Sequence, residues 1–593
     1  MLRYSVSSGG PILAKRKRRA VSTDRRDGPD SSRAQEPRVS GDTSVLKLLA
    51  LAGFFGALLV IYAPALDGEF ISDDEHYIER NVFIQNPSVD NLAAILNPTS
   101  VVSILVENYA PVHLLLHAAQ WQAFGDSVRG YHVVNLAVHA LATWLLVLLF
   151  LRSGIQPVAA WMAGAFFLVH PANVEAVAWI SQLKTSSALV LALLALLAHP
   201  RRPLLGTLCF ALALLAKPTA LVALPAVIGF GWARTRRGAE APVNWHWNWV
   251  LAWVAVLLLF AAAEWAAFAD TAGQAPPFYP EFDVRMRTTL AIALRYLVRA
   301  VTGQGVSVFQ EPPAAEQWLD PWWLISVFVL ALLAWRTVLT LRRRSEEAAW
   351  WLWSIAAFAP VSGVIPLPYP MADRYLYFML PGLLGGVLLA GPKLGLASWH
   401  LLGRGAPPDR VRRGVPMALL LVVAIGIVFF SNQTWQRAHV WQRLDYFMSE
   451  AARNYPEGVV AKTRAASRAA FEGDSVTAIA LLDDARARGY NRLDNVFRDP
   501  AYERIARSRE FEAYIDAWAL EEIERLENTS RPSQFSMRVI AQGYIVIDDL
   551  DAAEDSIRRG IEMDGPLGDE LRRDLEQIER QKRIRSSRKP ALD

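Results

Sequence analysis

The sequence has little cysteine and little excess charge. Its one cysteine, Cys209, lies inside an apolar run, so the chain cannot form an internal disulfide. Its 61 basic residues are offset by 57 acidic ones, which leaves a net charge of +4. The basic residues fall in short clusters between apolar runs, whereas a nucleic-acid-binding face is a continuous basic stripe. We therefore expect no nucleic-acid partner.

Apolar and aromatic residues are abundant instead. Hydrophobic residues make up 53% of the chain and 21 residues are Trp, a composition typical of a protein that crosses the membrane several times. The first long apolar run, residues 45–66, is followed by no small-residue cleavage site and is predicted to be a retained span rather than a signal peptide. Further runs fall at 131–151, 156–170, 183–199, 203–216, 219–233, 248–268, 321–341, 349–365, 375–391 and 415–430. The sequence thus predicts about eleven spans.

Basic residues between the runs predict the orientation. With this count, the arginines that follow the spans all share the side of the N-terminal tail, as the positive-inside rule requires. The run 288–301 must then lie in the membrane interface, since Arg295 and Arg299 would be costly at bilayer depth. We expect a cytoplasmic N-terminus, an inner-membrane location, and an external or periplasmic C-terminal domain.

Composition also predicts four parts of an all-α chain. Residues 1–44 are a basic, disordered cytoplasmic tail, and residues 45–431 are a polytopic membrane helical bundle with an external acidic loop at 67–110. Residues 432–580 are a small α-helical domain, and residues 581–593 are a disordered tail. Helical pairs with Gly or Asp turns at 461–488 and 536–563 resemble tetratricopeptide repeats, and an irregular helical bundle is the alternative.

Acidic residues are concentrated directly after the first predicted span, in the stretch Gly68–Ile78. Asp73, Asp74 and Glu75 repel one another, so the chain is expected to use them on a ligand, a metal or a proton. A solvated acidic loop is the simpler alternative.

Three more polar clusters interrupt the apolar sequence on the same predicted face. They are His170–Lys184, Lys217 at the turn of a hairpin, and Pro368–Tyr377. Each alone could be explained by helix capping, a snorkelling lysine or interfacial tyrosines. Together they predict a common site in which cations hold the phosphate of a lipid-linked sugar and a carboxylate activates a hydroxyl.

A helix is predicted on the membrane surface from Tyr109 to Trp121, with Pro111 in its first turn. His113 and His117 lie four residues apart on it. With the acidic loop they could bind a divalent cation, but an i, i+4 His pair is weak evidence, so the metal is left open.

Six motifs in order, spanning roughly residues 45–430, carry a family resemblance. They are Phe70–Asp74, Asn108–His113, Tyr131–Ala140, His170–Ser181, Ala216–Pro218 and Met371–Tyr377. The series resembles the transmembrane and tetratricopeptide-repeat O-mannosyltransferase family and its prokaryotic relatives, in the GT-C glycosyltransferase superfamily. The resemblance implies a polyprenyl-phosphate sugar donor, a catalytic acid in the first external loop, inversion of the anomeric centre, and repeats on the same face as the active site.

The resemblance also implies roles for single residues. Asp73 and Asp74 become candidates for the general base, with a slight preference for Asp74. The candidates for the donor phosphate are His170, Lys217 and Arg374, and the supporting residues are Glu175, Asp373, Tyr375 and His113. The chain departs from the family at Pro218, where relatives commonly have an acid, and at Gln182–Lys184, where they often have Gly-Arg.

The predicted function is therefore transfer of a sugar, a hexose such as mannose, to a hydroxyl of a protein, glycan or lipid on the external face. Besides this donor, acceptor and membrane lipids, a protein partner could bind the repeats. A ligase or polymerase of lipid-linked glycans, and a non-catalytic membrane scaffold that recruits partners through its repeats, are the alternatives. Substitution of Asp73 and Asp74 by Asn distinguishes the enzymes from the scaffold.

Overall fold

The computed structural model describes residues 43–106, 108–235, 245–268, 279, 281–363, 370–401, 417–528, 532, 534–563 and 567–588. Within these residues every regular element is a helix, which confirms the all-α prediction. By its contacts the chain divides into residues 1–48 and residues 49–593. Nearly all of the predicted basic tail, the end of the predicted C-terminal tail and residues 366–369 of the loop at 366–374 lie outside the described residues.

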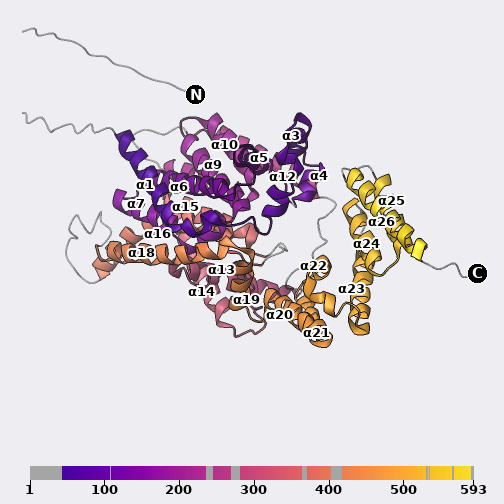
Figure 1. The fold of residues 1–593 in the computed structure, drawn as a ribbon. Helices are drawn as coiled ribbons and strands as arrows, with labels where there is room; N and C mark the ends of the chain where they lie inside the picture. The colour runs from indigo at the N-terminus through magenta and orange to yellow at the C-terminus, as the bar shows by residue number, and fades with distance from the viewer. Residues whose placement is uncertain are drawn as a thin grey trace, which may run out of the picture. The chain divides into compact units, whose positions relative to one another are not determined.

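Helices occupy the first three quarters of the chain in close succession (Figure 1). They are α1 (Thr43–Ile61), α2 (Val82–Gln85), α3 (Val89–Leu96), α4 (Val101–Leu105), α5 (Pro111–Phe124), α6 (Val128–Arg152), α7 (Pro157–Leu168), α8 (Val174–Ala178), α9 (Leu183–Ala198), α10 (Pro203–Ala216), α11 (Ala223–Arg234), α12 (Trp247–Phe268), α13 (Phe282–Thr302), α14 (Pro321–Arg342), α15 (Glu347–Phe358), α16 (Asp373–Leu401) and α18 (Met417–Ala438). Each of the eleven predicted apolar runs overlaps one of these helices.

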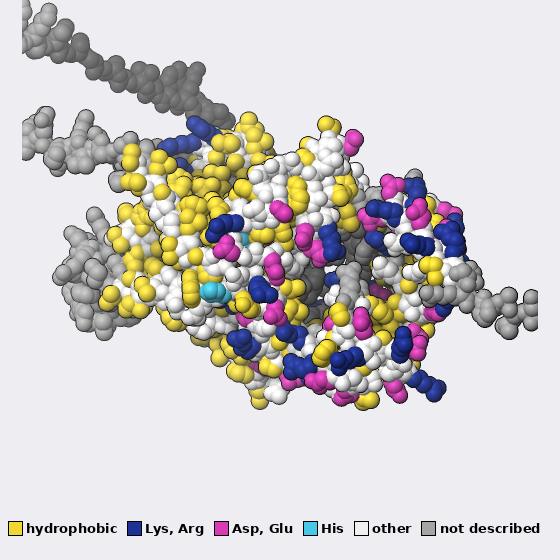
Figure 2. All heavy atoms as spheres, viewed as in Figure 1, with side chains coloured by type: hydrophobic (Ala, Val, Ile, Leu, Met, Phe, Trp, Pro, Cys, Tyr) yellow, Lys and Arg dark blue, Asp and Glu magenta, His cyan; other side chains and the backbone are white. Residues whose placement is uncertain are grey.

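Several helices have the length and the surface of membrane spans. Within the described residues, five are long and apolar enough to cross a bilayer, namely α6, α9 with the turn before it, α12, α14 and the first part of α16. A sixth results if the bent pair α7 and α8 is one span. On α12 and α14 large apolar side chains face outward, with Leu259 72% and Phe328 73% exposed. Figure 2 shows hydrophobic side chains gathered over α7 and α18 and charged ones over the C-terminal helices. The chain is a membrane protein, and the count of eleven spans stays a prediction.

The connection between α7 and α9 is a broken helix rather than a solvated loop. The chain bends by 51° between α7 and the segment from Pro171 to Ala178, and every residue from Phe167 to Val190 is buried. Its free carbonyls find partners from α6, because the Asn135 amide donates to the carbonyl oxygens of Val177, Trp179 and Ile180. Irregular backbone at membrane depth is tolerated only where protein satisfies it in this way.

Helices α15 and α16 pack closely because α16 presents glycines to two tryptophans. A Cβ atom at Gly385 would lie 2.2 Å from the ring of Trp350, and one at Gly386 would lie 2.7 Å from the ring of Trp351. Small residues at such crossings let two apolar helices approach each other. This contact fixes α16, whose first turn carries Asp373 and Arg374.

Helix α13 is not among the membrane-capable helices, in agreement with the interfacial position predicted from its arginines. The structure gives one of these arginines a structural partner. The guanidinium of Arg299 lies 2.8 Å from the carboxylate of Asp373, and Arg437 of α18 lies 3.5 Å from the other oxygen of the same carboxylate. Ser307 donates its backbone N–H to Asp373 at 2.9 Å. Asp373 therefore ties α13, α16 and α18 together.

The remaining helices form the charged C-terminal part of the chain. They are α19 (Leu444–Asn454), α20 (Val459–Glu472), α21 (Ser475–Ala487), α22 (Leu493–Arg498), α23 (Arg509–Glu527), α24 (Gln534–Val546), α25 (Leu550–Glu562) and α26 (Gly568–Arg588). Both predicted helical pairs are present: α20 and α21 turn at Gly473, which has φ +89°, and α24 and α25 turn at Asp548, which has φ +66°. The repeat assignment stays a prediction. Helix α18 continues past the predicted boundary at residue 431, because Thr434 donates to the carbonyl of Val169 at 2.8 Å.

Candidate active site

The acidic loop after the first helix turns one of its carboxylates inward. Ser72 has φ +55°, a left-handed conformation that is uncommon for a residue with a side chain, and it reverses the chain just before Asp74. The carboxylate of Asp74 then accepts a hydrogen bond from the backbone N–H of Ile71 at 3.1 Å. Asp73 stays partly exposed, and Glu75 pairs with Arg80 at the surface. The structure thus separates two aspartates between which the sequence supported only a slight preference for Asp74.

The other oxygen of Asp74 joins the broken helix. It accepts hydrogen bonds from the backbone N–H of Ser181 at 2.8 Å and from the Ser181 hydroxyl. Asp74 is fully buried. Burial raises the pKa of Asp74 to about 7, against the opposing effect of its hydrogen bonds from Ser181 and Ile71. A carboxyl group with such a pKa can hold or accept a proton near neutral pH.

The same broken helix also contacts Arg374, through Glu175, six residues before Ser181 in the sequence. Glu175 of α8 accepts from the backbone N–H of Arg374 at 2.7 Å and forms an ion pair with its guanidinium. The indole of Trp179 links the two halves of the site, because its N–H donates to the carbonyl of Ile71 at 3.3 Å while the Arg374 guanidinium lies 5.5 Å from its ring. Residues 174–181 therefore carry contacts to both Asp74 and Arg374.

Two lysines complete a cationic cluster. Lys217, at the turn between α10 and α11, donates to the Thr185 hydroxyl at 2.6 Å, and Lys184 donates to the Tyr77 hydroxyl at 3.1 Å. Burial lowers the pKa of Lys217, and the nearby charges of Lys184 and Arg374 lower it further. Lys217 is thus close to two further cations and to the Glu175 carboxylate, and among the described residues this excess of positive charge favours an added anion.

Histidines of α5 line the cluster. Helix α5 begins with Pro111 as predicted, but its histidine face is buried against protein. The rings of His113 and Tyr77 lie 5.0 Å apart, and those of His113 and His117 lie 4.4 Å apart. Burial and the cations around it lower the pKa of His113 well below its usual range. Neither ring nitrogen of His113 makes a hydrogen bond of good geometry among the described residues, and the nearby Ser181 backbone opposes the lowering of its pKa only in part, so a neutral imidazole faces the cluster.

Metal binding was the open question for these histidines. Within the described residues, no three His, Cys, Asp or Glu side chains are grouped as a metal site requires. His117 uses one ring nitrogen to contact Gln120 at 2.7 Å, and Asp74 is committed to Ser181. Among the side chains that the structure describes, the donor set does not fit a resident divalent ion, and we derive no step through one.

Two predicted site residues lie in structural roles. His170 contacts the carbonyl of Ala300 with Nε2 at 3.2 Å and accepts from the backbone N–H of Ala172 with Nδ1, so both ring nitrogens have partners. Asp373 is held by Arg299 and Arg437 on another side of α16. Tyr375 lies beside the Arg374 guanidinium, 5.1 Å from ring centre to the guanidinium carbon. The phosphate-binding prediction for His170 has no support from these contacts.

Sequence reasoning missed Tyr77, Ser181 and Lys184 as individual site residues. The stretch Ser181–Lys184 had been noted as a polar cluster, and Lys184 stands at the start of an otherwise apolar helix. A lysine at the start of an apolar helix was the signal that the sequence offered, and the structure then shows that Lys184 is only 8% exposed. The partnership of Ser181 with Asp74 had no signal, since the two residues are 107 positions apart.

Comparison with known proteins places the chain near one group of transferases. No protein-family model matches it. It is 32% identical over 205 residues to Protein O-mannosyl-transferase Tmtc1 of Drosophila melanogaster and 27% identical over 215 residues to Protein O-mannosyl-transferase F38B6.6 of Caenorhabditis elegans. The alignments cover 32% and 34% of this chain, and 24% and 30% of the two relatives. The chain is a relative of these O-mannosyltransferases that matches less than a third of their length.

Two solved structures of oligosaccharyltransferase from Archaeoglobus fulgidus also resemble the chain. One is tethered with an acceptor peptide. Its alignment covers 65% of this chain and 55% of the solved chain, with 13% identity and a TM-score of 0.34. The other is AglB in complex with an inhibitory peptide and a dolichol-phosphate. Its alignment covers 67% of this chain and 56% of the solved chain, with 14% identity and a TM-score of 0.35.

Proposed function

We propose that the chain is a GT-C type membrane glycosyltransferase. It moves a sugar, a hexose such as mannose, from a polyprenyl-phosphate donor to a hydroxyl of a protein, glycan or lipid. The observation that carries the proposal is the shared attachment of Asp74 and Arg374 to residues 174–181, which brings a proton acceptor near a group of cations. The kinship with O-mannosyltransferases supports the same reading.

In this proposal Asp74 is the general base. The acceptor oxygen attacks the anomeric carbon of the sugar while its proton passes to the Asp74 carboxylate. The bond from that carbon to the phosphate oxygen breaks, and the electron pair remains on the phosphate. Lys184, Lys217 and Arg374 stabilise the charge that develops there, an effect that is strong at a buried site. Attack opposite the leaving group inverts the anomeric centre, as the family resemblance implies.

Supporting residues hold this arrangement. Glu175 orients Arg374 through two contacts, and Ser181 orients Asp74 through its backbone and hydroxyl groups. The neutral His113 can donate or accept one hydrogen bond to the donor. We further propose that the site faces the periplasm or exterior, with the N-terminus cytoplasmic, and that the C-terminal helices bind the acceptor or a partner protein.

Mass spectrometry of cell-envelope glycans and proteins tests the proposal. Cells without the gene should lack one hexose on a defined acceptor, and the wild-type gene should restore it. The Asp74→Asn and Lys184→Met variants should insert in the membrane at wild-type levels and fail to restore the hexose. The Glu79→Gln variant, at an exposed position of the same loop, should restore it. Restoration of the hexose by the Asp74→Asn variant would support a scaffold instead.

A further inference from the structure

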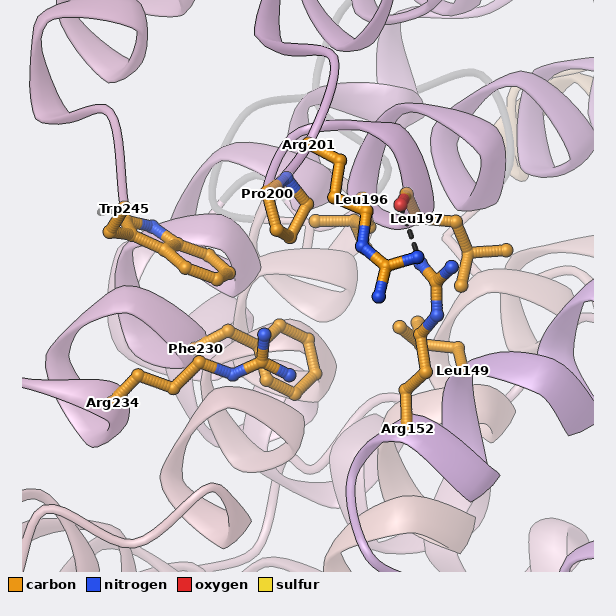
Figure 3. A pocket seen from close by; sticks show the side chains of 9 residues that line it. All are labelled: Leu149, Arg152, Leu196, Leu197, Pro200, Arg201, Phe230, Arg234 and Trp245. Carbon is orange, nitrogen blue, oxygen red and sulfur yellow. Dashed lines mark hydrogen bonds between the residues drawn. The ribbon is translucent and has the colours of Figure 1, made fainter. Parts of the chain in front are cut away.

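A second group of positive side chains lies at the opposite end of the same helices. Arg152 ends α6, Arg201 lies in the turn between α9 and α10, and Arg234 ends α11. They line a cavity of about 200 Å³ together with Leu149, Leu196, Leu197, Pro200, Phe230 and Trp245 (Figure 3). Helix α9 has 16 residues and so spans about 24 Å between Lys184 of the candidate active site and this cavity.

The arginines carry more positive charge than their neighbours neutralise. Figure 3 shows the guanidinium groups of Arg152 and Arg201 beside each other, and both Arg201 and Arg234 repel Arg152 electrostatically. Arg234 pairs with Glu346 at 3.1 Å. Among the described residues, neither Arg152 nor Arg201 forms an ion pair, and Arg152 instead donates to the carbonyl of Leu197 at 2.5 Å. Three guanidinium groups around one carboxylate leave a site that favours an anion.

Two of the three guanidinium groups, those of Arg152 and Arg234, have contacts that hold them at the cavity, whereas the exposed Arg201 side chain lines it without such a contact among the described residues. The ring of Trp245 lies 5.1 Å from the Arg234 guanidinium, and its indole N–H donates to the carbonyl of Val227 at 3.1 Å. Trp245 is buried. Trp245 therefore forms a fixed wall of the cavity. The Arg152 side chain, which also lines the cavity, is held by its hydrogen bond to the Leu197 carbonyl. A guanidinium group can donate two parallel hydrogen bonds to the oxygens of one phosphate group.

We propose that this cavity binds the phosphate of an anionic phospholipid headgroup. The walls favour a lipid over a soluble phosphate, because Leu149, Leu196 and Phe230 belong to apolar helices whose other ends reach the candidate active site. Basic cavities at the ends of membrane helices are where anionic headgroups bind. Leu204 and Leu208, on the first turns of α10, are about half exposed and offer an apolar surface for the acyl chains. The inference does not depend on the proposed transferase activity.

Binding is tested with the full chain in nanodiscs of phosphatidylcholine, with and without phosphatidylglycerol. The pocket variant is Arg152→Gln/Arg201→Gln. The matched control is Arg202→Gln/Arg343→Gln, which removes the same charge from two exposed arginines that do not line the cavity. Native mass spectrometry counts the phosphatidylglycerol molecules that remain bound, and thermal unfolding measures the stabilisation by that lipid.

We expect the pocket variant to bind phosphatidylglycerol about tenfold more weakly or worse, which corresponds to about 1.4 kcal/mol. The control should stay within about twofold of the wild type. Equal losses in both variants would show diffuse attraction by surface charge and overturn the proposal, as would no loss in the pocket variant. Inorganic phosphate in phosphatidylcholine discs provides the remaining arm. If it stabilises the wild type as much as phosphatidylglycerol does, the cavity binds a soluble anion and the lipid assignment is wrong.

Discussion

Replacing Asp74 by asparagine keeps the shape of the side chain and removes its charge. In the wild type, burial raises the pKa of Asp74 from 3.8 to about 7. One pKa unit corresponds to about 1.36 kcal/mol, so ionising this carboxyl in the folded protein costs about 4 kcal/mol more than in the unfolded chain. The asparagine variant has no such cost.

The pH dependence follows from the sign of this shift. The folded state holds the Asp74 proton up to a pH near 7, whereas the unfolded state releases it near pH 3.8. Stability contributed by the protonated form is therefore lost as the pH rises between those values and levels off above 7. Between pH 5 and pH 8, Asp74 alone should reduce the unfolding free energy of the wild type by about 3 kcal/mol.

Thermal unfolding in detergent, at pH 5 and pH 8, measures this effect. We expect the wild type to lose stability relative to the Asp74→Asn variant as the pH rises, by about 2 °C in melting temperature for a chain of this size. At pH 5 the variant should be the less stable protein, because an amide N–H in place of one oxygen meets the N–H of Ile71 or Ser181 and leaves a buried donor unsatisfied, at about 1–3 kcal/mol.

Activity provides the second readout of the same variant. If Asp74 is the base, sugar transfer by the wild type should rise with pH through about 7, and the variant should lose about 10²- to 10⁴-fold in rate. The Asp73→Asn variant is the control, since Asp73 is partly exposed and its carboxylate accepts a hydrogen bond from the Ser72 hydroxyl at 3.4 Å. Our reasoning would be refuted if Asp73→Asn abolished transfer while Asp74→Asn kept the wild-type rate and pH profile.

Three further predictions concern other parts of the structure. The Glu175→Gln variant should lose about 3 kcal/mol of stability, because the guanidinium of Arg374, only 14% exposed, loses its carboxylate; an unchanged melting temperature would contradict this role. The Gly385→Val variant should lose about 1–3 kcal/mol through overlap with Trp350, whereas Gly391→Ala, with open space around it, should melt like the wild type. If the proposed transfer is correct, the purified protein should keep its activity in excess chelator, because the described His, Cys, Asp and Glu side chains are not grouped as a metal site. A loss of activity that added divalent cation restores would contradict this.

Local features of the sequence were sufficient to predict the helices. Apolar runs of bilayer length coincide with helices because their residues gain by burial whatever they contact. That α13 is not a candidate span followed from the order of the basic clusters and from Arg295 and Arg299 within it, and its interfacial position stays a prediction. The turn after α20 could also be predicted, because Gly473 adopts positive φ and Asp474 caps the next helix through the N–H of Thr477. These helices and this turn are determined by interactions between residues that are close in the sequence.

Tertiary structure decided which polar residues meet. Whether Asp74 or Asp73 turns inward depends on Ser181, more than 100 residues away, and on the reversal at Ser72. Asp373 and Arg374 are adjacent in sequence, yet one pairs with Arg299 of α13 and the other with Glu175 of α8. Burial and charge partners set the pKa and the availability of such groups, and both arise only when distant helices pack.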